Sequence, residues 1–106
     1  MTETFDPIKV LRELSEAGVE FVLIGGFAAS VLGAPHITTD TDICASRSRE
    51  NLDRLSSALR SLHARIRVEG VDDGFPFDHD GESLGRALIW NLRTDCGDLD
   101  VCFVPA

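Results

Sequence analysis

Apolar residues in the first quarter of the chain follow a helical spacing and then form a continuous run. The stripe that follows Asp6-Pro7 predicts a first helix, because Asp can cap free amides and Pro suits the first helical position. Gly18 is expected to end this helix. The continuous apolar run over residues 19–24 predicts a short buried strand. Gly25-Gly26 ends that strand and is expected to open a second helix over residues 27–32.

The middle of the chain first alternates and then returns to a helical spacing. Alternating polar and apolar residues over 38–45 predict a second strand whose aspartates share one face. Ser46 or Ser48 is expected to cap a third helix. The apolar face of that helix is predicted from leucines at positions 52, 55, 59 and 62.

The second half of the chain is expected to supply three more strands. Residues 65–69 predict a short strand, and residues 71–83 predict a loop by their Gly, Pro and Asp content. Residues 87–93 and 98–104 predict a hairpin with a four-residue connection over 94–97. The order of elements therefore predicts a mixed α/β domain, with helices packed on a sheet of about five strands.

Size and charge limit the classes of protein to which the chain can belong. It has 106 residues, of which 43% are hydrophobic, so residues 1–106 are expected to form one domain with a modest core. The net charge of −8 argues against a nucleic-acid surface built from this segment alone. Phosphate ligands are still compatible with this charge, because bound metal ions can reverse the local field.

The sequence predicts a cytoplasmic protein without membrane contact. No apolar run approaches the roughly 20 residues that cross a bilayer. The acidic N-terminus lacks the basic and apolar parts of a signal peptide. Cys44, Cys96 and Cys102 are an odd number of cysteines without a CxxC pair, which indicates reduced thiols rather than a disulfide framework.

Acidic residues recur on two of the predicted strands. Asp40 and Asp42 lie about 6.6 Å apart along a strand and face the same way. Asp100, on a neighbouring strand, is expected to complete the cluster, with Asp98 as the alternative third carboxylate. Oxygen ligands suit Mg²⁺, and carboxylates packed so closely would repel one another without a cation. The other interpretation is that these aspartates are ordinary turn residues.

The glycine pair offers a second kind of contact. Gly25-Gly26 would let the backbone approach a ligand closely, and free amides at a helix N-terminus attract phosphate oxygens. Ser30, one turn later, could add a hydroxyl contact to the same phosphates. The alternative is that Gly-Gly is simply a turn from strand to helix. The order of the glycine pair, the two aspartates and the late acidic strand favours the functional interpretation.

Three motifs in this order resemble those of the nucleotidyltransferase (DNA polymerase beta-like) superfamily. They are Ile24-Gly25-Gly26, Asp40-Thr41-Asp42-Ile43 and Leu99-Asp100-Val101. The longer sequence segments over residues 38–43 and 97–101 look most like those of the bacterial branch that includes AbiEii-type toxins of toxin–antitoxin systems. The resemblance covers roughly residues 19–104 and implies a nucleotidyltransferase-like fold.

The resemblance implies transfer of a nucleoside monophosphate from an NTP to a hydroxyl, with release of pyrophosphate. The acceptor would be a tRNA, a protein or a small molecule, and a cognate antitoxin is an implied partner. Asp40 and Asp42 would bind two Mg²⁺ ions, or Mn²⁺ in their place, and Asp100 would be the third carboxylate that helps activate the acceptor. Gly25 and Gly26 would hold the triphosphate. The alternative is an inactive binding module that keeps the fold within a toxin–antitoxin or regulatory complex.

Three features depart from the pattern of the family. Thr41 stands where the superfamily often has an apolar residue, although Thr still suits a strand. His36 stands where related sequences often carry Arg, so a titratable group replaces a permanent cation. The C-terminal helical region that commonly helps to bind nucleotide and acceptor is not found after residue 104. The chain is therefore expected to be a truncated, minimal or degenerate form of the family.

Several other residues could act as ligands, but simpler roles are preferred for them. Arg47 and Arg49 follow the second strand and could reach phosphates, but a solvated surface position is the preferred interpretation. The acidic stretch within residues 71–83 resembles half of a calcium loop but lacks its terminal Glu, so we expect a solvated loop. Trp90 lies in an apolar run and is expected in the core rather than as a base-stacking platform.

Overall fold

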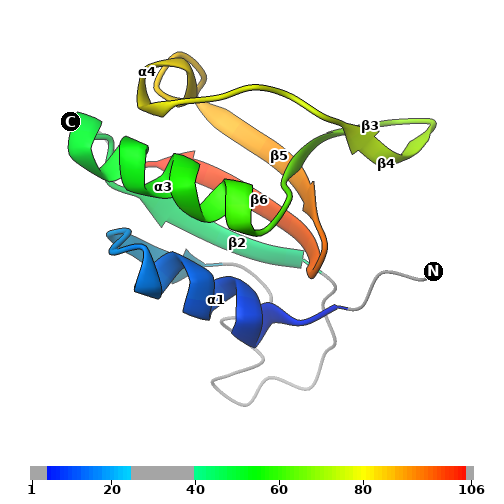
Figure 1. Ribbon diagram of the computed structural model, residues 1–106, viewed down its shortest axis with the longest axis horizontal. Helices are drawn as coiled ribbons and strands as arrows, with labels where there is room; N and C mark the ends of the chain where they lie inside the picture. The colour runs from blue at the N-terminus through cyan, green and yellow to red at the C-terminus, as the bar shows by residue number, and fades with distance from the viewer. Residues whose placement is uncertain (1–4, 25–39, 105–106) are drawn as a thin grey trace.

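A six-stranded mixed sheet with three helices forms the part of the chain that the computed structural model describes, residues 5–24 and 40–104 (Figure 1). The helices are α1 (Pro7–Glu16), α3 (Arg49–Ser61) and α4 (Gly81–Leu84). The strands are β1 (Phe21–Ile24), β2 (Asp40–Ala45), β3 (Arg65–Val68), β4 (Val71–Phe75), β5 (Ile89–Thr94) and β6 (Gly97–Phe103). The prediction of a mixed α/β domain is confirmed, with one strand more than expected.

The strands lie in the order β1-β2-β6-β5-β3-β4. Strands β2 and β6 are parallel, and every other neighbouring pair is antiparallel. The strand that carries Asp98 and Asp100 is therefore in the interior of the sheet, next to the strand that carries Asp40 and Asp42. The expectation that these two acidic strands are neighbours is confirmed.

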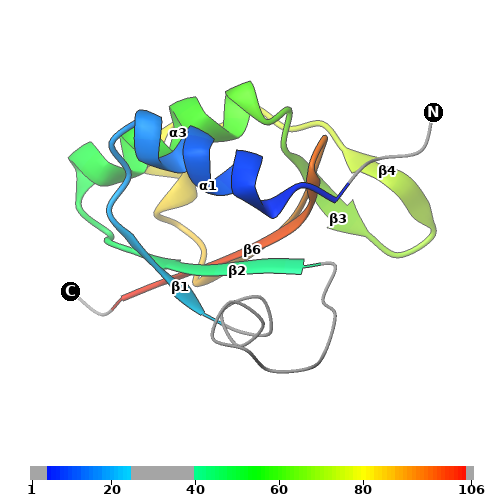
Figure 2. The same cartoon turned by 90° about the horizontal axis from the view of Figure 1, so that it is seen from below.

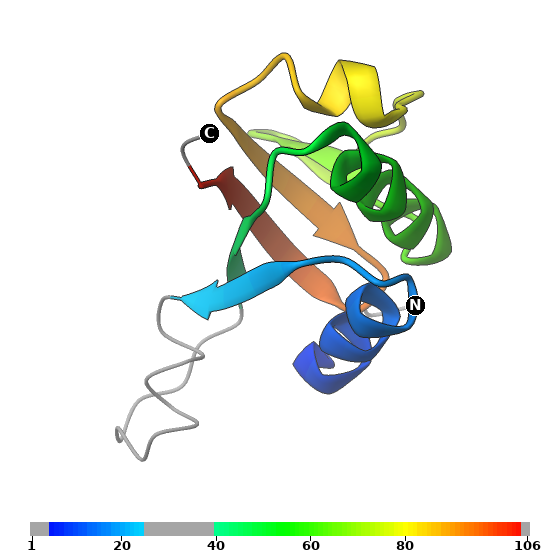
Figure 3. The ribbon, with the colours of Figure 1, turned by 90° about the vertical axis from the view of Figure 1, so that its left-hand side faces the viewer.

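The helices and the sheet form two layers. Helices α1 and α3 lie side by side on one face of the sheet (Figure 2). The side view shows no helix of the described residues on the opposite face, which we call the open face (Figure 3). Alternate residues of β2 and β6 point into the layer between sheet and helices, where Ile43, Leu99 and Val101 are fully buried. They pack with leucines of the helices, among them Leu14, Leu55 and Leu59.

The helices begin as the sequence predicts. The Asp6 side chain accepts a hydrogen bond from the Lys9 amide at 3.1 Å, and Pro7 occupies the first position of α1. Ser48, rather than Ser46, caps α3 by accepting from the Asn51 amide at 3.2 Å. The predicted apolar face of α3 is confirmed, because Leu52, Leu55, Leu59 and Leu62 are all buried.

The first strand is less buried than its continuous apolar run predicts. Strand β1 pairs with β2 along one side, and its residues alternate between half-buried and exposed. Val22 is 59% exposed and lies on the open face, whereas Phe21 and Leu23 pack against the core. The prediction of a strand buried on both faces is wrong, because within the described residues helices cover only one face of the sheet.

Residues 71–83 are more ordered than the loop that their composition predicts. Residues 71–75 form β4, which pairs with β3 across a turn in which Gly70 has a φ of 83°. A short helix, α4, follows, and Asp80 caps it reciprocally with Ser83. The polar sequence Val-Asp-Asp-Gly-Phe forms a strand because β4 lies at the edge of the sheet, where its polar side chains reach solvent. The hairpin of β5 and β6 is confirmed, with a turn of only two residues, Asp95 and Cys96.

Asn51 is a buried polar residue that the sequence pattern does not single out. Its side-chain oxygen accepts from the Glu20 amide at 2.7 Å, and its amide nitrogen donates to the carbonyl oxygens of Glu20 and Ser46 at 3.1 and 2.8 Å. Glu20 precedes β1, and Ser46 follows β2. One side chain therefore fixes the start of α3 to both strands at this edge of the sheet.

His79 joins the segment before α4 to helix α3 in the buried interior. It is 7% exposed, and its Nδ1 lies 2.6 Å from Ser56 Oγ. The Ser56 hydroxyl also donates to the His79 carbonyl oxygen at 3.2 Å. Burial lowers the pKa of His79 below its ordinary value, and the nearby charge of Arg60 lowers it further. The folded protein therefore favours the neutral imidazole.

The free energy of unfolding is expected to fall as the pH is lowered below about 6.5. In this range the unfolded chain takes up a proton on His79 before the folded chain does, so protonation favours unfolding until the lower folded-state pKa is passed. Urea unfolding at pH values of about 7.5 and 5.5 measures the loss. His79→Gln should show a smaller loss of unfolding free energy between these pH values than the wild type does. The exposed control His63→Gln should show the same loss as the wild type. An equal pH dependence in wild type and His79→Gln would contradict this assignment.

Candidate functional site

The open face of the sheet carries a double row of side chains from β2 and β6. Parallel pairing places Asp42 opposite Asp100, and it aligns the neighbouring pairs in the same register, Asp40 with Asp98 and Cys44 with Cys102. Adjacent strands lie about 4.8 Å apart, so residues that share a register and a face are in contact range. The predicted grouping of Asp40, Asp42 and Asp100 on one face is confirmed, whereas their roles stay predictions.

The alternation of β2 explains why its acids are accessible. Asp40, Asp42 and Cys44 are half-buried, and the intervening Thr41, Ile43 and Ala45 are fully buried against the helices. In β6, Leu99 and Val101 anchor the core in the same way. The apolar residues fix the two strands, so the acidic side chains are held on the opposite face by the core itself.

Asp42 and Asp100 form a carboxyl pair at the centre of this face. Burial raises the pKa of Asp100 above the ordinary carboxyl range, the charge of Arg67 opposes the rise, and a hydrogen bond with Asp42 adds to it. Two neighbouring carboxyl groups that share a hydrogen bond retain a proton or need a cation. Of the two candidates for the third carboxylate, Asp100 is the one that pairs with Asp42, whereas Asp98 stands opposite Asp40.

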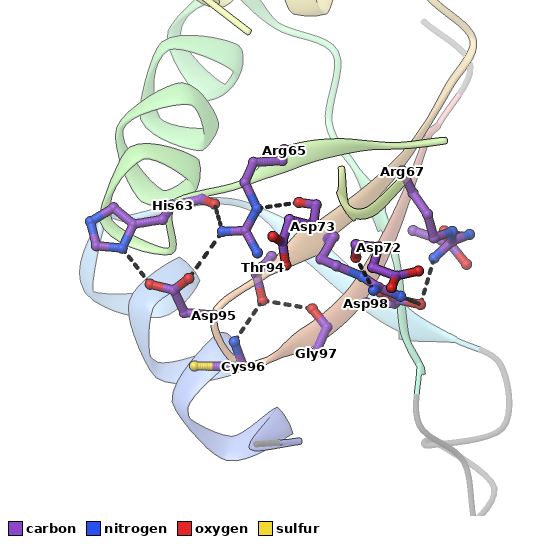
Figure 4. Close-up of polar contacts among 12 residues, drawn as sticks. His63, Arg65, Arg67, Asp72, Asp73, Thr94, Asp95, Cys96, Gly97 and Asp98 are labelled. Carbon is purple, nitrogen blue, oxygen red and sulfur yellow. Dashed lines mark hydrogen bonds and ion pairs between the residues drawn. The ribbon is translucent and has the colours of Figure 1, made fainter. Parts of the chain in front are cut away.

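Arg67 contacts Asp100 of this pair, and it comes from β3 on the far side of β5. Its Nη2 donates to Asp100 Oδ1 at 2.8 Å, and its Nη1 lies 3.2 Å from Asp98 Oδ2. Arg93 on β5 donates to Asp98 Oδ1 at 3.0 Å. Figure 4 shows Arg67 beside Asp98 on the open face. Asp98 is thus held by two arginines, whereas Asp100 is shared between one arginine and Asp42.

Sequence reasoning missed Arg67 and Arg93 as parts of the site. The signal for Arg67 was the alternation Arg65-Ile66-Arg67, which places two arginines on the same face of a strand. Arg65 is occupied elsewhere, with Asp95 at 3.0 Å and the carbonyl oxygen of His63 at 2.7 Å (Figure 4). Only the fold shows which of the two arginines reaches the acids.

Two cavities lie near the site, one lined by the carboxyl pair and the other by Arg67 and Arg93. One of about 110 Å³ has mostly apolar walls and is lined by Ile24, Asp42, Ile43, Ile89, Asp100 and Cys102. The other, of about 370 Å³, lies between the β3–β4 hairpin and β5 and is lined by Arg67, Val68, Glu69, Gly70, Val71, Asp72, Asn91 and Arg93. Arg67 therefore contacts the carboxyl pair and also borders the larger cavity.

The carboxylate oxygens of this pair are the type of ligand that a hard divalent cation prefers. Asp42 and Asp100 offer carboxylate oxygens from adjacent positions, and their partly buried charge requires compensation. Within residues 5–24 and 40–104, however, no three His, Cys, Asp or Glu side chains are arranged closely enough to hold a metal ion. In this arrangement the guanidinium of Arg67, rather than a prepared three-ligand site, neutralises Asp100.

The remaining candidate residues fall outside the site or outside the described ranges. Gly25, Gly26, Ser30, His36 and the predicted helix over 27–32 lie outside the described residues. Arg47 donates to the Gly85 carbonyl oxygen at 2.9 Å and lies over the Phe103 ring, so it is a structural residue rather than a solvated one.

Four other expectations concern residues that are not part of the carboxyl pair itself. Arg49 forms an exposed ion pair with Asp53, as expected for a surface residue. Trp90 stacks on Phe77 at 5.5 Å and donates to the Leu84 carbonyl oxygen, which confirms a structural role. All three cysteines are free thiols, as expected. The expectation of a solvated loop over 71–83 is wrong in part, because residues 71–75 form β4 and His79 is buried.

Comparison with protein families, with characterised proteins and with solved structures gave no significant match over any part of the chain. None of the described helices is long and apolar enough to cross a membrane. The class that the structure itself defines is a mixed α/β domain with an acidic pair on the open face of its sheet.

Proposed function

We propose that this chain is a metal-dependent nucleotidyltransferase domain with a nucleotidyltransferase-like fold. The observation that carries the proposal is the pairing of Asp42 with Asp100 on the open face, with Asp40 two residues away on the same face. These are the carboxylates that the three sequence motifs single out. The helices leave that face uncovered within the described residues, and one cavity lined by the pair and another bordered by Arg67 offer room for ligands.

In the proposed reaction, a hydroxyl oxygen of the acceptor forms a bond to the α-phosphorus of an NTP. The bond from that phosphorus to the pyrophosphate oxygen breaks, and the hydroxyl proton passes to a base. Asp40, Asp42 and Asp100 would hold two Mg²⁺ ions, or Mn²⁺, which supply charge neutralisation for the phosphates. By the resemblance of the motifs, Asp100 would help to activate the acceptor hydroxyl, and it contacts Arg67, which borders the larger cavity.

The remaining parts of the proposal rest on the resemblance of the motifs. Gly25, Gly26 and Ser30 would contact the triphosphate. The acceptor would be a tRNA, a protein or a small molecule, and the protein would act in the cytoplasm, as a toxin whose partner is an antitoxin. The acidic chain, with its net charge of −8, favours a small-molecule or protein acceptor over a large RNA held by this segment alone.

One observation favours a second candidate, an inactive binding module with the same fold. Arg67 and Arg93 already neutralise Asp98 and Asp100, as structural ion pairs do. In that case the acids would stabilise the sheet, and a protein partner would occupy the open face. Metal-dependent release of pyrophosphate would exclude this candidate.

Calorimetric titration of each of the four NTPs, in Mg²⁺ and in EDTA, tests the main proposal. We expect at least one NTP to bind, with affinity lost in EDTA because the carboxylates repel the triphosphate when no cation is present. Pyrophosphate release in the presence of candidate acceptors then tests turnover. A folded sample that binds no NTP in Mg²⁺ or Mn²⁺ would overturn the proposal and leave the binding module as the better description.

A further inference from the structure

We infer that Arg67 is a positioning residue that controls access of a divalent cation to Asp100, so that guanidinium and metal ion bind this carboxylate in alternation. The inference rests on the proposed function, since it concerns the same carboxylates. It adds a residue that none of the three motifs contains. Arg67 would set how readily the site loads its cation.

The contacts of Arg67 place it where an ion would have to bind. Its Nη2 lies 2.8 Å from Asp100 Oδ1, on the carboxyl group that faces Asp42 across the β2–β6 register. Within the described ranges no three acidic, His or Cys side chains form a prepared metal site. A cation that bridges Asp42 and Asp100 would therefore share the Asp100 carboxylate with this guanidinium unless the two separate.

Electrostatics make the two occupants mutually exclusive. A guanidinium and a divalent ion that share one half-buried carboxylate would lie close together and repel each other. Arg67 cannot release its charge, because an arginine side chain stays protonated in proteins. Relief must therefore come from movement of its side chain rather than from loss of a proton.

The surroundings of Arg67 allow that movement without unfolding of β3. Its side chain is 31% exposed and borders the cavity of about 370 Å³ beside β5. Its Nη1 is buried and makes no hydrogen bond of good geometry within the described part of the chain, only the 3.2 Å ion pair with Asp98. The guanidinium is thus incompletely bonded where it lies, and it could retain Asp98 while it leaves Asp100.

Binding of Mn²⁺ alone, without nucleotide, tests the inference by calorimetry on the full chain. Arg67→Gln should tighten Mn²⁺ binding by about tenfold or more, because the competing charge-assisted contact is removed. Arg93→Gln is the matched control, since it removes the same charge from a residue that pairs with Asp98. It should change the affinity by less than about threefold, as expected for a screened charge that is not in direct contact.

The outcomes separate this inference from the proposed function. If wild type binds Mn²⁺ but Arg67→Gln binds it equally or more weakly, the inference is wrong and the metal site stands. Equal tightening by Arg67→Gln and Arg93→Gln would also overturn it, since that result indicates only a change in net charge. If none of the variants binds Mn²⁺, both the inference and the metal site are wrong. Arg67→Lys, which keeps the charge but loses the planar guanidinium contact, is the second variant if Arg67→Gln does not fold. It should tighten Mn²⁺ binding by less than about tenfold but by more than Arg93→Gln does, and unchanged affinity would overturn the inference.

Discussion

Replacing Asp42 with asparagine is expected to lower metal-dependent pyrophosphate release by more than about 100-fold. Asparagine keeps the size of the side chain but removes the negative charge that the proposed cations need. Loss of even an indirect partner of a metal ligand commonly costs 10- to 100-fold, so loss of a direct ligand should cost more. The measurement is the rate of pyrophosphate release at saturating NTP and Mg²⁺, compared with that of the wild type.

The same substitution should leave the fold intact, which separates a chemical effect from unfolding. Asp42 is half-buried beside Asp100, and an amide at position 42 removes the repulsion between two carboxylates. The free energy of unfolding should therefore stay the same or rise slightly. Asp53→Asn is the matched control, because Asp53 lies in an exposed ion pair on α3 and should keep full activity. Full activity in Asp42→Asn would remove this residue from the catalytic site.

A second large effect is expected at Leu99, where alanine should lower the free energy of unfolding by about 3 kcal/mol. Leu99 is fully buried and lies in β6 between the two acids of that strand. Its side chain fills the layer between the sheet and the helices, so truncation leaves a cavity as well as losing apolar contact. Urea unfolding followed by circular dichroism measures the change.

Leu88→Ala provides the control for this change in stability. It makes the same chemical substitution at a residue that is 82% exposed, so the free energy of unfolding should change by less than about 0.5 kcal/mol. Similar losses in both variants would indicate that the interior of the sheet does not pack as described. A loss confined to Leu99→Ala would show that the core residues of β6 support the strand that carries Asp100.

The elements with strong periodicity could be predicted from the sequence. The leucines of α3 recur at helical spacing, and the residues of β2 alternate between core and open face, so pattern alone identifies both elements and their orientation. The caps at Asp6 and Ser48 follow from the ability of their side chains to accept from free amides.

Strand β4 could not be predicted because its sequence resembles a turn. Val71 and Phe75 flank two aspartates and a glycine, and only the pairing with β3 at the edge of the sheet makes them a strand. The error on β1 has a related cause, since an apolar run does not show how many of its faces are covered. Burial depends on neighbours that lie far away in the sequence.

The acids of the site were predictable, whereas their counter-ions were not. Asp40, Asp42 and Asp100 belong to local motifs, and alternation shows which way they face. Arg67 reaches Asp100 across an intervening strand, a contact that depends on the strand order β6-β5-β3. No spacing in the sequence specifies this order, so the charge balance of the site becomes visible only in the fold.

The parallel pairing of β2 with β6 has a consequence for how the chain folds. The β5–β6 hairpin closes through a two-residue turn, whereas Asp42 and Asp100 are separated by more than half of the chain. Closing such a long loop costs entropy before the new contacts compensate for it, so pairings of this kind tend to be slow steps. The acidic pair is therefore expected to assemble late in folding, when β2 docks on a hairpin that has already formed. Cations that shield the two carboxylates would then act on the rate of refolding as well as on the stability of the finished site.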